Sequence, residues 1–210
     1  MFNMLRSIVV LTLSIMICIQ AALTTQAASA PSAIAVSMKT TTYKNGSAKF
    51  PVVSGHISKD AQEKINGYMR KEVQQFMQSG KEAQTAQLET SVTYNQKGLI
   101  SFLILYDDYY EGAAHGLQTL KGYTFETATG KLCRLRDLYD IDGTGRDFIN
   151  SEISRKIEEN EITLFEPFNG ISGNPEFYLV PDYVVIVYQP YEIAPYAAGI
   201  LEFPIPAKSH

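Results

Sequence analysis

The sequence contains no tryptophan and only two cysteines, Cys18 and Cys133, among its 210 residues. Cys18 lies in an apolar N-terminal segment that we expect to be removed, so Cys133 is left alone and an internal disulfide is excluded. Cys133 stands in the run LCRL, where a buried small apolar side chain is expected rather than a reactive thiol. Stability must therefore come from an apolar core, and a hydrophobic fraction of 45% excludes wholesale disorder.

An excess of basic residues is also absent. The chain has 18 Lys and Arg against 22 Asp and Glu, with a formal net charge of -4. Binding to nucleic acid normally requires a basic patch or stripe, so no nucleic-acid partner is expected. The length fits one domain, or at most two small ones.

The motifs of the common catalytic classes are missing as well. There are only three histidines, His56, His115 and His210, and the chain has no H-E-x-x-H, G-x-S-x-G or paired C-x-x-C motif. Glu111 and His115 stand four residues apart, but the glycines next to them argue against a shared helix face. Because zinc catalysis usually takes three protein ligands, we expect no metal and no cofactor.

Residues 1–30 have the organisation of a secretory signal peptide. Arg6 supplies a positive charge, residues 7–23 are almost wholly apolar, and small residues follow up to Ala30. We expect cleavage after Ala27 or after Ala30, which leaves 17 basic and 22 acidic residues and a net charge of -5. The mature chain is then expected to be extracytoplasmic, either periplasmic or secreted, with no membrane span after cleavage of the signal peptide.

The remaining residues predict hairpins that alternate with helices. Asn45-Gly46 between two β-forming runs is a strong hairpin signal, and Ser58 precedes apolar residues at helical spacing. The expected strands are 34–44, 47–54, 84–95, 99–109, 117–126, 177–180, 183–189 and 200–205, and the expected helices are 58–79 and 144–160. The run LISFLILY at 99–106 is nearly continuously apolar, so its strand should be covered on both faces.

This order, ββ-α-βββ-α-ββ(β), predicts an α+β fold. Because hairpins dominate, we expect a largely antiparallel sheet with two helices packed on one face.

Two segments stand out because each follows an apolar strand and combines tyrosines, acids and small residues. They are residues 106–116 (YDDYYEGAAHG) and 189–199 (QPYEIAPYAAG). The candidate ligand-binding residues in them are Tyr109, Tyr110, Glu111, His115, Gln189, Tyr191, Glu192 and Tyr196. A tyrosine ring with its polar end suits both a core edge and an interface. Two interpretations therefore stay open: loops whose rings close one end of the core, or a recognition surface.

The same segments carry a family resemblance. The pattern Y-x-x-G-A-A-H-G at 109–116 is followed by TFETATGK at 124–131, LRDLY at 135–139, FYLVPD at 177–182 and YQPYEIAPYAAG at 188–199. In that order they resemble the exported domain of the RsiV-type anti-sigma factors, a family of unknown general function. Residues from about 40 to 95 resemble the companion domain of PdaC-type peptidoglycan deacetylases. The resemblance implies a subdomain at 31–95 and an RsiV-like domain at 96–210, within one compact α+β unit.

What the resemblance implies is binding rather than catalysis. RsiV-type proteins use this exported region to bind lysozyme. Six residues precede the apolar run and no deacetylase motif follows, so we expect neither the sigma sequestration of that family nor deacetylation to carry over to this sequence.

Two hypotheses of function follow. The first is a non-enzymatic extracytoplasmic binding domain that recognises a lysozyme-like hydrolase or a cell-wall glycan, such as a peptidoglycan fragment, through the two segments rich in tyrosine and acids. The alternative is a hydrolase of cell-wall polysaccharide, with Glu111, His115 and Glu192 as its acid and base groups. The absence of catalytic motifs favours the first.

Overall fold

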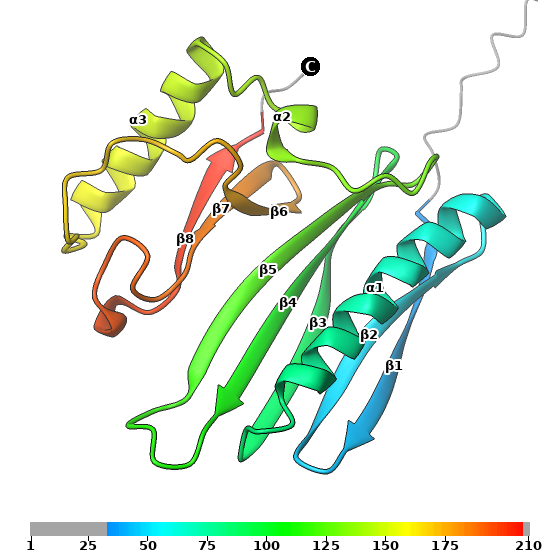
Figure 1. Cartoon of the computed structure of the whole chain (residues 1–210). Helices are drawn as coiled ribbons and strands as arrows, with labels where there is room; N and C mark the ends of the chain where they lie inside the picture. Colours follow the sequence, from blue (N-terminus) through cyan, green and yellow to red (C-terminus); the bar gives the residue numbers. More distant parts are fainter. Residues whose placement is uncertain (1–32, 208–210) are drawn as a thin grey trace, which may run out of the picture.

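A computed structural model of the chain describes residues 33–207, so the signal peptide expected at 1–30 lies outside the described residues. Five strands form the larger sheet, in the order β1 (Ala35–Tyr43), β2 (Gly46–Ser54), β3 (Thr85–Gln96), β4 (Leu99–Tyr109) and β5 (Leu117–Glu126) (Figure 1). Neighbouring strands are antiparallel except β2 and β3. That pair is parallel because α1 (Lys59–Ser79) carries the chain back along the sheet before β3 begins.

Helix α1 forms where the sequence predicts it and covers one face of this sheet. The Ser58 side chain accepts a hydrogen bond from the Ala61 N–H at 3.2 Å, which satisfies a backbone donor of the first turn. The apolar stripe of the helix is buried against the strands and comprises Ile65, Met69, Val73 and Phe76. Within this contact the buried Asn66 side chain bonds both the N–H and the carbonyl of Val53, so its own amide groups are paired away from water.

The second half of the chain builds a smaller sheet with its own helix. Its strands are β6 (Glu176–Val180), β7 (Tyr183–Tyr188) and β8 (Leu201–Pro206), all antiparallel and in that order. The short α2 (Leu135–Leu138) and then α3 (Thr144–Glu159) precede them, and the 3-10 turn η1 (Tyr196–Ala198) lies between β7 and β8. Helix α3 packs on this sheet through the buried Ile149 and Ile153.

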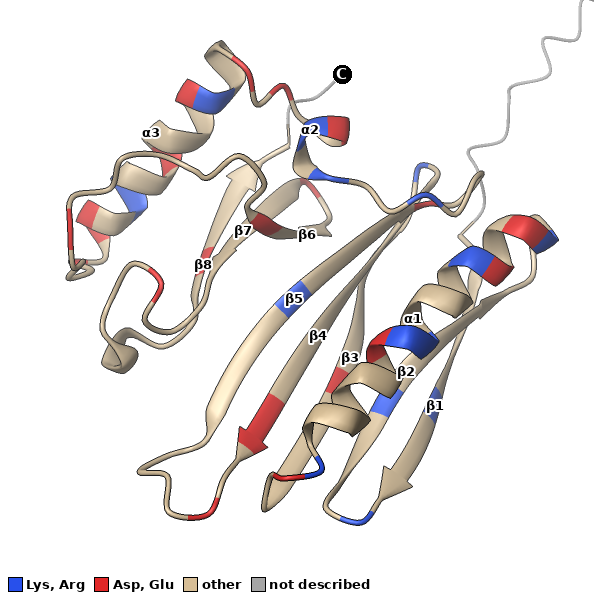
Figure 2. Cartoon of the chain, viewed as in Figure 1, with Lys and Arg blue, Asp and Glu red and all other residues tan. Residues whose placement is uncertain are grey.

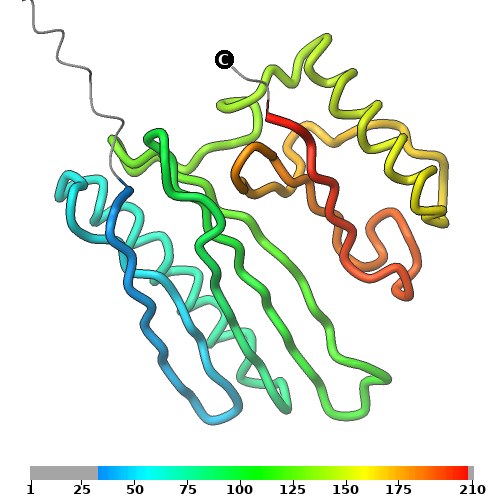
Figure 3. Tube along the Cα trace, turned by 180° about the vertical axis from the view of Figure 1, so that it is seen from behind, coloured from blue at the N-terminus to red at the C-terminus, as the bar shows by residue number. Residues whose placement is uncertain are grey.

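The two sheets pack face to face, so that the molecule has four layers: α1, the larger sheet, the smaller sheet and α3 (Figures 1 and 3). Side chains of β4 and β5 meet those of β6 and β7, among them Leu120 and Val187. The strands approach closely at Gly122, where an added Cβ would lie 1.8 Å from the Phe177 carbonyl oxygen. Close by, the Ser101 hydroxyl accepts a hydrogen bond from the Leu179 N–H at 3.0 Å.

The predicted α+β class and the order of the elements are confirmed, and the structure adds α2 and η1. The strands differ from the expected single sheet, because they divide into two sheets, and each sheet carries one helix on its outer face. The continuous apolar run in β4 is covered on both faces, as predicted: Ile100 and Phe102 face α1, whereas Leu103 faces the smaller sheet. Such a run indicates double coverage, but it does not indicate whether a helix or a second sheet provides it.

The larger sheet includes residues on both sides of the subdomain boundary expected between residues 95 and 96, since β3 and β4 form one hairpin. Cys133 is 8% exposed, as expected for a small apolar side chain, and burial raises the pKa of its thiol. None of the helices within residues 33–207 is long and apolar enough to cross a membrane.

Candidate functional site

The two segments singled out in the sequence meet at one end of the molecule. The loop after β4 (residues 110–116) brings His115 against Tyr196 from the loop after β7, with ring centroids 3.8 Å apart and ring planes 19° from parallel. Tyr191 lies beside Tyr196, with centroids 5.5 Å apart and an interplanar angle of 30°. We call His115, Tyr196 and Tyr191 the aromatic platform.

Hydrogen bonds to one carbonyl hold the platform in place. The Tyr196 hydroxyl donates to the Gly116 carbonyl oxygen at 2.9 Å. His115 Nδ1 lies 2.9 Å from the same oxygen, so this nitrogen carries the proton and donates it. The two stacked rings therefore share a single acceptor at the start of β5, which fixes the orientation of the stack.

Gln189 joins the second loop to the free edge of β5. Its Oε1 accepts a hydrogen bond from the Leu120 N–H at 3.0 Å, and its Nε2 donates one to the Leu120 carbonyl at 2.7 Å. The side-chain amide therefore satisfies the two backbone groups that a neighbouring strand would otherwise bond. Glu192 in turn accepts a hydrogen bond from the Gln189 N–H at 2.8 Å. Gln189 and Glu192 thus position the loop that carries Tyr191 and Tyr196.

Tyr191 is presented to solvent by a turn that normally favours glycine. Its φ is +68°, and the turn is closed by a hydrogen bond of 3.0 Å from the Glu192 N–H to the Gln189 carbonyl. A residue other than glycine costs about 1–3 kcal/mol in this region, and such strain concentrates at functional sites. Tyr191 is nevertheless 56% exposed, and its ring contacts the ring of Tyr196 alone among the described residues.

The tyrosines of the two segments divide into core and surface residues. Tyr106 is half-buried and donates to Glu72 at 3.2 Å. Tyr188 is 6% exposed and lies in the core between the smaller sheet and α3. Its burial, together with the nearby Glu192, raises its pKa to about 12. Tyr191 and Tyr110 are exposed instead. Burial therefore fits the core interpretation for Tyr106 and Tyr188, and the recognition surface stays a prediction for the exposed rings.

Three of the candidate residues lie apart from the stack. Tyr109 makes a long hydrogen bond of 3.5 Å to the Ala113 carbonyl within its own loop. Tyr110 lies near Tyr43, whose pKa is raised by burial and then by the charges of Asp108 and Tyr110. Glu111 is exposed on the loop. Among the described residues, no ring contact or hydrogen bond links these three to the platform.

Acidic residues lie in and beside the two loops that form the platform. Figure 2 shows acids at the end of β4 and in both loops, with no basic residue in either loop. Asp107 accepts a hydrogen bond from Gln118 at 3.0 Å and lies against Gly116, beside the stack. Burial, with a smaller contribution from Asp107, raises the pKa of Asp108.

The geometry does not assemble an acid and base from Glu111, His115 and Glu192. Within residues 33–207, His115 bonds a backbone carbonyl and Glu192 bonds a backbone N–H, and no hydrogen bond joins either carboxylate to the imidazole. The same residues contain no group of three His, Cys, Asp or Glu side chains able to hold a metal ion.

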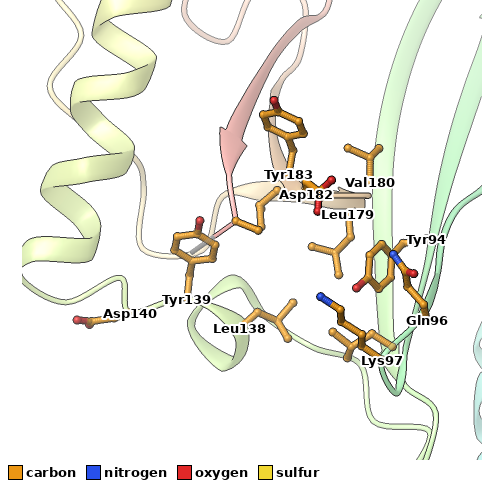
Figure 4. Close-up of a pocket in the computed structure, with 13 residues that line it drawn as sticks. Tyr94, Gln96, Lys97, Leu138, Tyr139, Asp140, Leu179, Val180, Asp182 and Tyr183 are labelled. Atoms are coloured by element: carbon orange, nitrogen blue, oxygen red, sulfur yellow. The ribbon is translucent and has the colours of Figure 1, made fainter. Parts of the chain in front are cut away.

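A cavity of about 610 Å³ lies at the opposite end of β4, between the two sheets (Figure 4). Its lining comes from the β3–β4 hairpin, α2 with the residues after it, the β6–β7 hairpin and the residue after β8: Tyr94, Gln96, Lys97, Leu99, Leu138, Tyr139, Asp140, Leu179, Val180, Asp182, Tyr183, Val184 and Ala207. The sequence indicates both turns but not this cavity, because residues from four separate segments form it.

The comparisons with known proteins agree with this architecture. Residues 137–208 match the family model DUF3298, described as a protein of unknown function. This stretch contains α3, the smaller sheet and the loop with Gln189, Tyr191, Glu192 and Tyr196, whereas the loop with His115 lies before it. No curated protein sequence matches the chain.

Two solved structures share the fold over most of the chain. A DUF3298 family member from Bacteroides fragilis is 17% identical with a TM-score of 0.60, over 84% of this chain and 92% of that one. A DUF3298 family protein from Pseudomonas aeruginosa is 16% identical with the same TM-score and the same coverage of both chains. The match to the family is thus shown for residues 137–208, and the likeness of fold extends across both sheets.

Proposed function

We propose that this protein is an extracytoplasmic binding domain that recognises a basic, lysozyme-like hydrolase through the aromatic platform. The observation that supports the proposal most strongly is Tyr191, an exposed ring on a strained turn, backed by the stacked pair of Tyr196 and His115. The strained backbone at Tyr191 costs free energy and exposes a large aromatic ring to water. A binding partner that packs on the ring would offset this cost.

The chemistry of the platform suits a cationic partner. Tyrosine and arginine are enriched among the residues that contribute most to protein interfaces, and a lysine or arginine over an aromatic face is attracted by about 0.5–2 kcal/mol. Glu111 in the loop of His115, Asp107 against Gly116 and Glu192 next to Tyr191 place negative charge at this end of the molecule, which favours the encounter with a basic surface at low salt.

The sequence supports the location and the class of partner. Residues 1–30 have the organisation of a signal peptide, and the segments that meet at the platform are those that resemble the lysozyme-binding region of RsiV-type proteins. Export also predicts that the purified mature protein begins at Ala28 or Pro31, which N-terminal sequencing would establish.

The test is isothermal titration calorimetry of the exported protein, produced from the full sequence, with hen lysozyme. Cytochrome c serves as an equally basic control protein, and soluble peptidoglycan fragments probe a glycan ligand. We expect binding to lysozyme alone, and a loss of at least about tenfold in affinity for Tyr191→Ala. Tyr183→Ala is the matched control, since Tyr183 is also an exposed tyrosine, at 43%, but lies at the cavity end of the molecule and should leave the affinity unchanged.

The outcomes separate the possibilities. Equal binding of lysozyme and cytochrome c would show that the interaction depends only on the positive charge of the partner, and it would overturn the proposal. Binding of the peptidoglycan fragments instead, with loss in Tyr191→Ala, would keep the platform as the site but replace the protein partner by a glycan. Wild-type affinity in Tyr191→Ala would remove the platform from the interaction.

A further inference from the structure

The cavity between the sheets has one basic group, the exposed Lys97, on a wall that combines leucines with tyrosines and the carboxylates of Asp140 and Asp182. Its volume of about 610 Å³ lies within the range of about 300–1,000 Å³ that is usual for small-molecule sites. Leu99, Leu138 and Leu179 supply much of the wall, and Figure 4 shows the Lys97 amine and the Tyr94 hydroxyl on the same side of the space, facing Leu179.

Backbone geometry fixes the position of Lys97. Lys97 and Gly98 have φ angles of +52° and +76°, as in the two-residue turns that join twisted hairpin strands. The Gly98 carbonyl accepts a hydrogen bond from the Thr127 N–H at 2.8 Å, which ties the turn to the end of β5. The lysine therefore extends from a braced turn rather than from a free loop.

Lys97 also has no counter-ion. None of the ion pairs among residues 33–207 includes Lys97 or Asp182, although both line the cavity. Asp182 stands on the β6–β7 turn, at a φ of +65° and on the far side of Leu179 from Lys97 in Figure 4. A negative group entering the cavity is attracted toward Lys97 and repelled from Asp182, so its orientation is defined.

We propose that this cavity binds a small single-chain amphiphile with an anionic head group. The head group accepts hydrogen bonds from the Lys97 ammonium and the Tyr94 hydroxyl, and the hydrocarbon chain lies against Leu99, Leu138 and Leu179. This site is separate from the aromatic platform, because the two occupy opposite ends of β4.

The experiment uses three probes that share one alkyl chain, each below its micelle concentration: decanoate, decylammonium and decyl maltoside. Calorimetry of the exported protein should show decanoate binding most tightly and decylammonium most weakly. Lys97→Gln should lower the affinity for decanoate about fivefold or more while the affinity for decyl maltoside stays the same, since only the charged hydrogen bond is lost. Lys97→Arg should restore the preference for decanoate.

Two further variants keep the test specific to the cavity. Ala207→Trp should abolish binding of all three probes by filling the space, because Ala207 is an exposed residue of the lining and not part of the core. Lys71→Gln removes an exposed lysine of α1 and should change nothing. Equal affinities for decanoate and decylammonium, or unchanged binding in Ala207→Trp, would overturn the proposal. Binding to anionic phosphatidylglycerol vesicles but not to decanoate would assign the lysine to a membrane surface and overturn it too.

Discussion

The two ends of β4 carry sites of opposite character. At its C-terminal end, the loops after β4 and β7 form an exposed aromatic platform with acids in and beside these loops. At its N-terminal end, the turn before β4 and the turn before β7 line a cavity whose one basic residue, Lys97, forms no ion pair within residues 33–207. Both ends combine one segment from each sheet, so the packing of the two sheets determines both.

The contact at Gly122 is therefore where both ends can be broken together. In Gly122→Ala the new Cβ would meet the Phe177 carbonyl oxygen at 1.8 Å, and backbone cannot yield as a flexible side chain can. We expect a loss of about 3 kcal/mol in the free energy of unfolding, measured by urea titration. Gly173→Ala is the control, since its Cβ meets no atom within 4 Å. Equal stability of the two variants would show that the sheets slide apart at little cost.

Gln189 affects the platform end alone. In Gln189→Ala, the Leu120 N–H and carbonyl lose their partner at the edge of β5, and we expect a loss of about 2 kcal/mol in stability together with the loss of lysozyme binding. The probes of the cavity should bind to this variant as to the wild type. Gln118→Ala removes an exposed amide from β5, the strand of Leu120, and should lower the free energy of unfolding by less than about 0.5 kcal/mol. A parallel loss at both ends would mean that the ends are coupled.

Two substitutions of Tyr191 separate the effect of backbone strain on stability from the effect of the ring on binding. Tyr191→Gly and Tyr191→Ala both remove the ring, but only glycine accepts a φ of +68° without strain. The glycine variant should therefore be more stable than the alanine variant by about 1 kcal/mol, as measured by thermal unfolding, while both lose the partner. A more stable alanine variant would show that the turn relaxes and that no strain is stored there.

The smallest effect is expected at Glu176, which bonds the Gly122 N–H at 2.7 Å between the two ends. Burial raises the pKa of Glu176 from its ordinary 4.5, although the hydrogen bond from Gly122 opposes the shift. The folded state then holds its proton at a pH where the unfolded state has lost it, so stability falls as the pH rises through 4.5 toward the raised value.

Glu176→Gln keeps the acceptor for Gly122 and removes the charge. Urea titrations across this pH range should show a smaller fall in stability for this variant than for the wild type. Glu82→Gln, at an exposed position, should reproduce the wild-type slope. Identical slopes for all three proteins would mean that the carboxylate remains ionised at no cost.

The elements and the platform loops could be predicted because their signals lie in continuous segments. Asn45-Gly46, the Ser58 cap and the apolar run in β4 are each local, and so is the combination of tyrosines and acids after β4 and β7. The division into two sheets could not be predicted, since apolar residues on both faces of β4 are compatible with a helix or a sheet on either side.

The role of Gln189 and the cavity were equally hidden in the sequence. The partner of Gln189 is the backbone of Leu120, 69 residues earlier, and a backbone group leaves no signature in the side chains. Lys97 and Asp182 appear in the sequence as ordinary turn residues, and only the packing of the sheets brings both to one cavity.

The hydrogen bonds along the outer edge of β5 also limit how two molecules can associate by pairing their strands. Along the outer edge of β5, Gln189 bonds both backbone groups of Leu120, Glu176 bonds the Gly122 N–H and the Cys133 N–H bonds the Thr124 carbonyl, so much of this edge is already occupied. Within residues 33–207 the larger sheet ends on its other side at β1, which pairs with β2 alone. Growth of this sheet by strand addition is thus limited to one side, which permits a closed pair of molecules but not an open-ended filament.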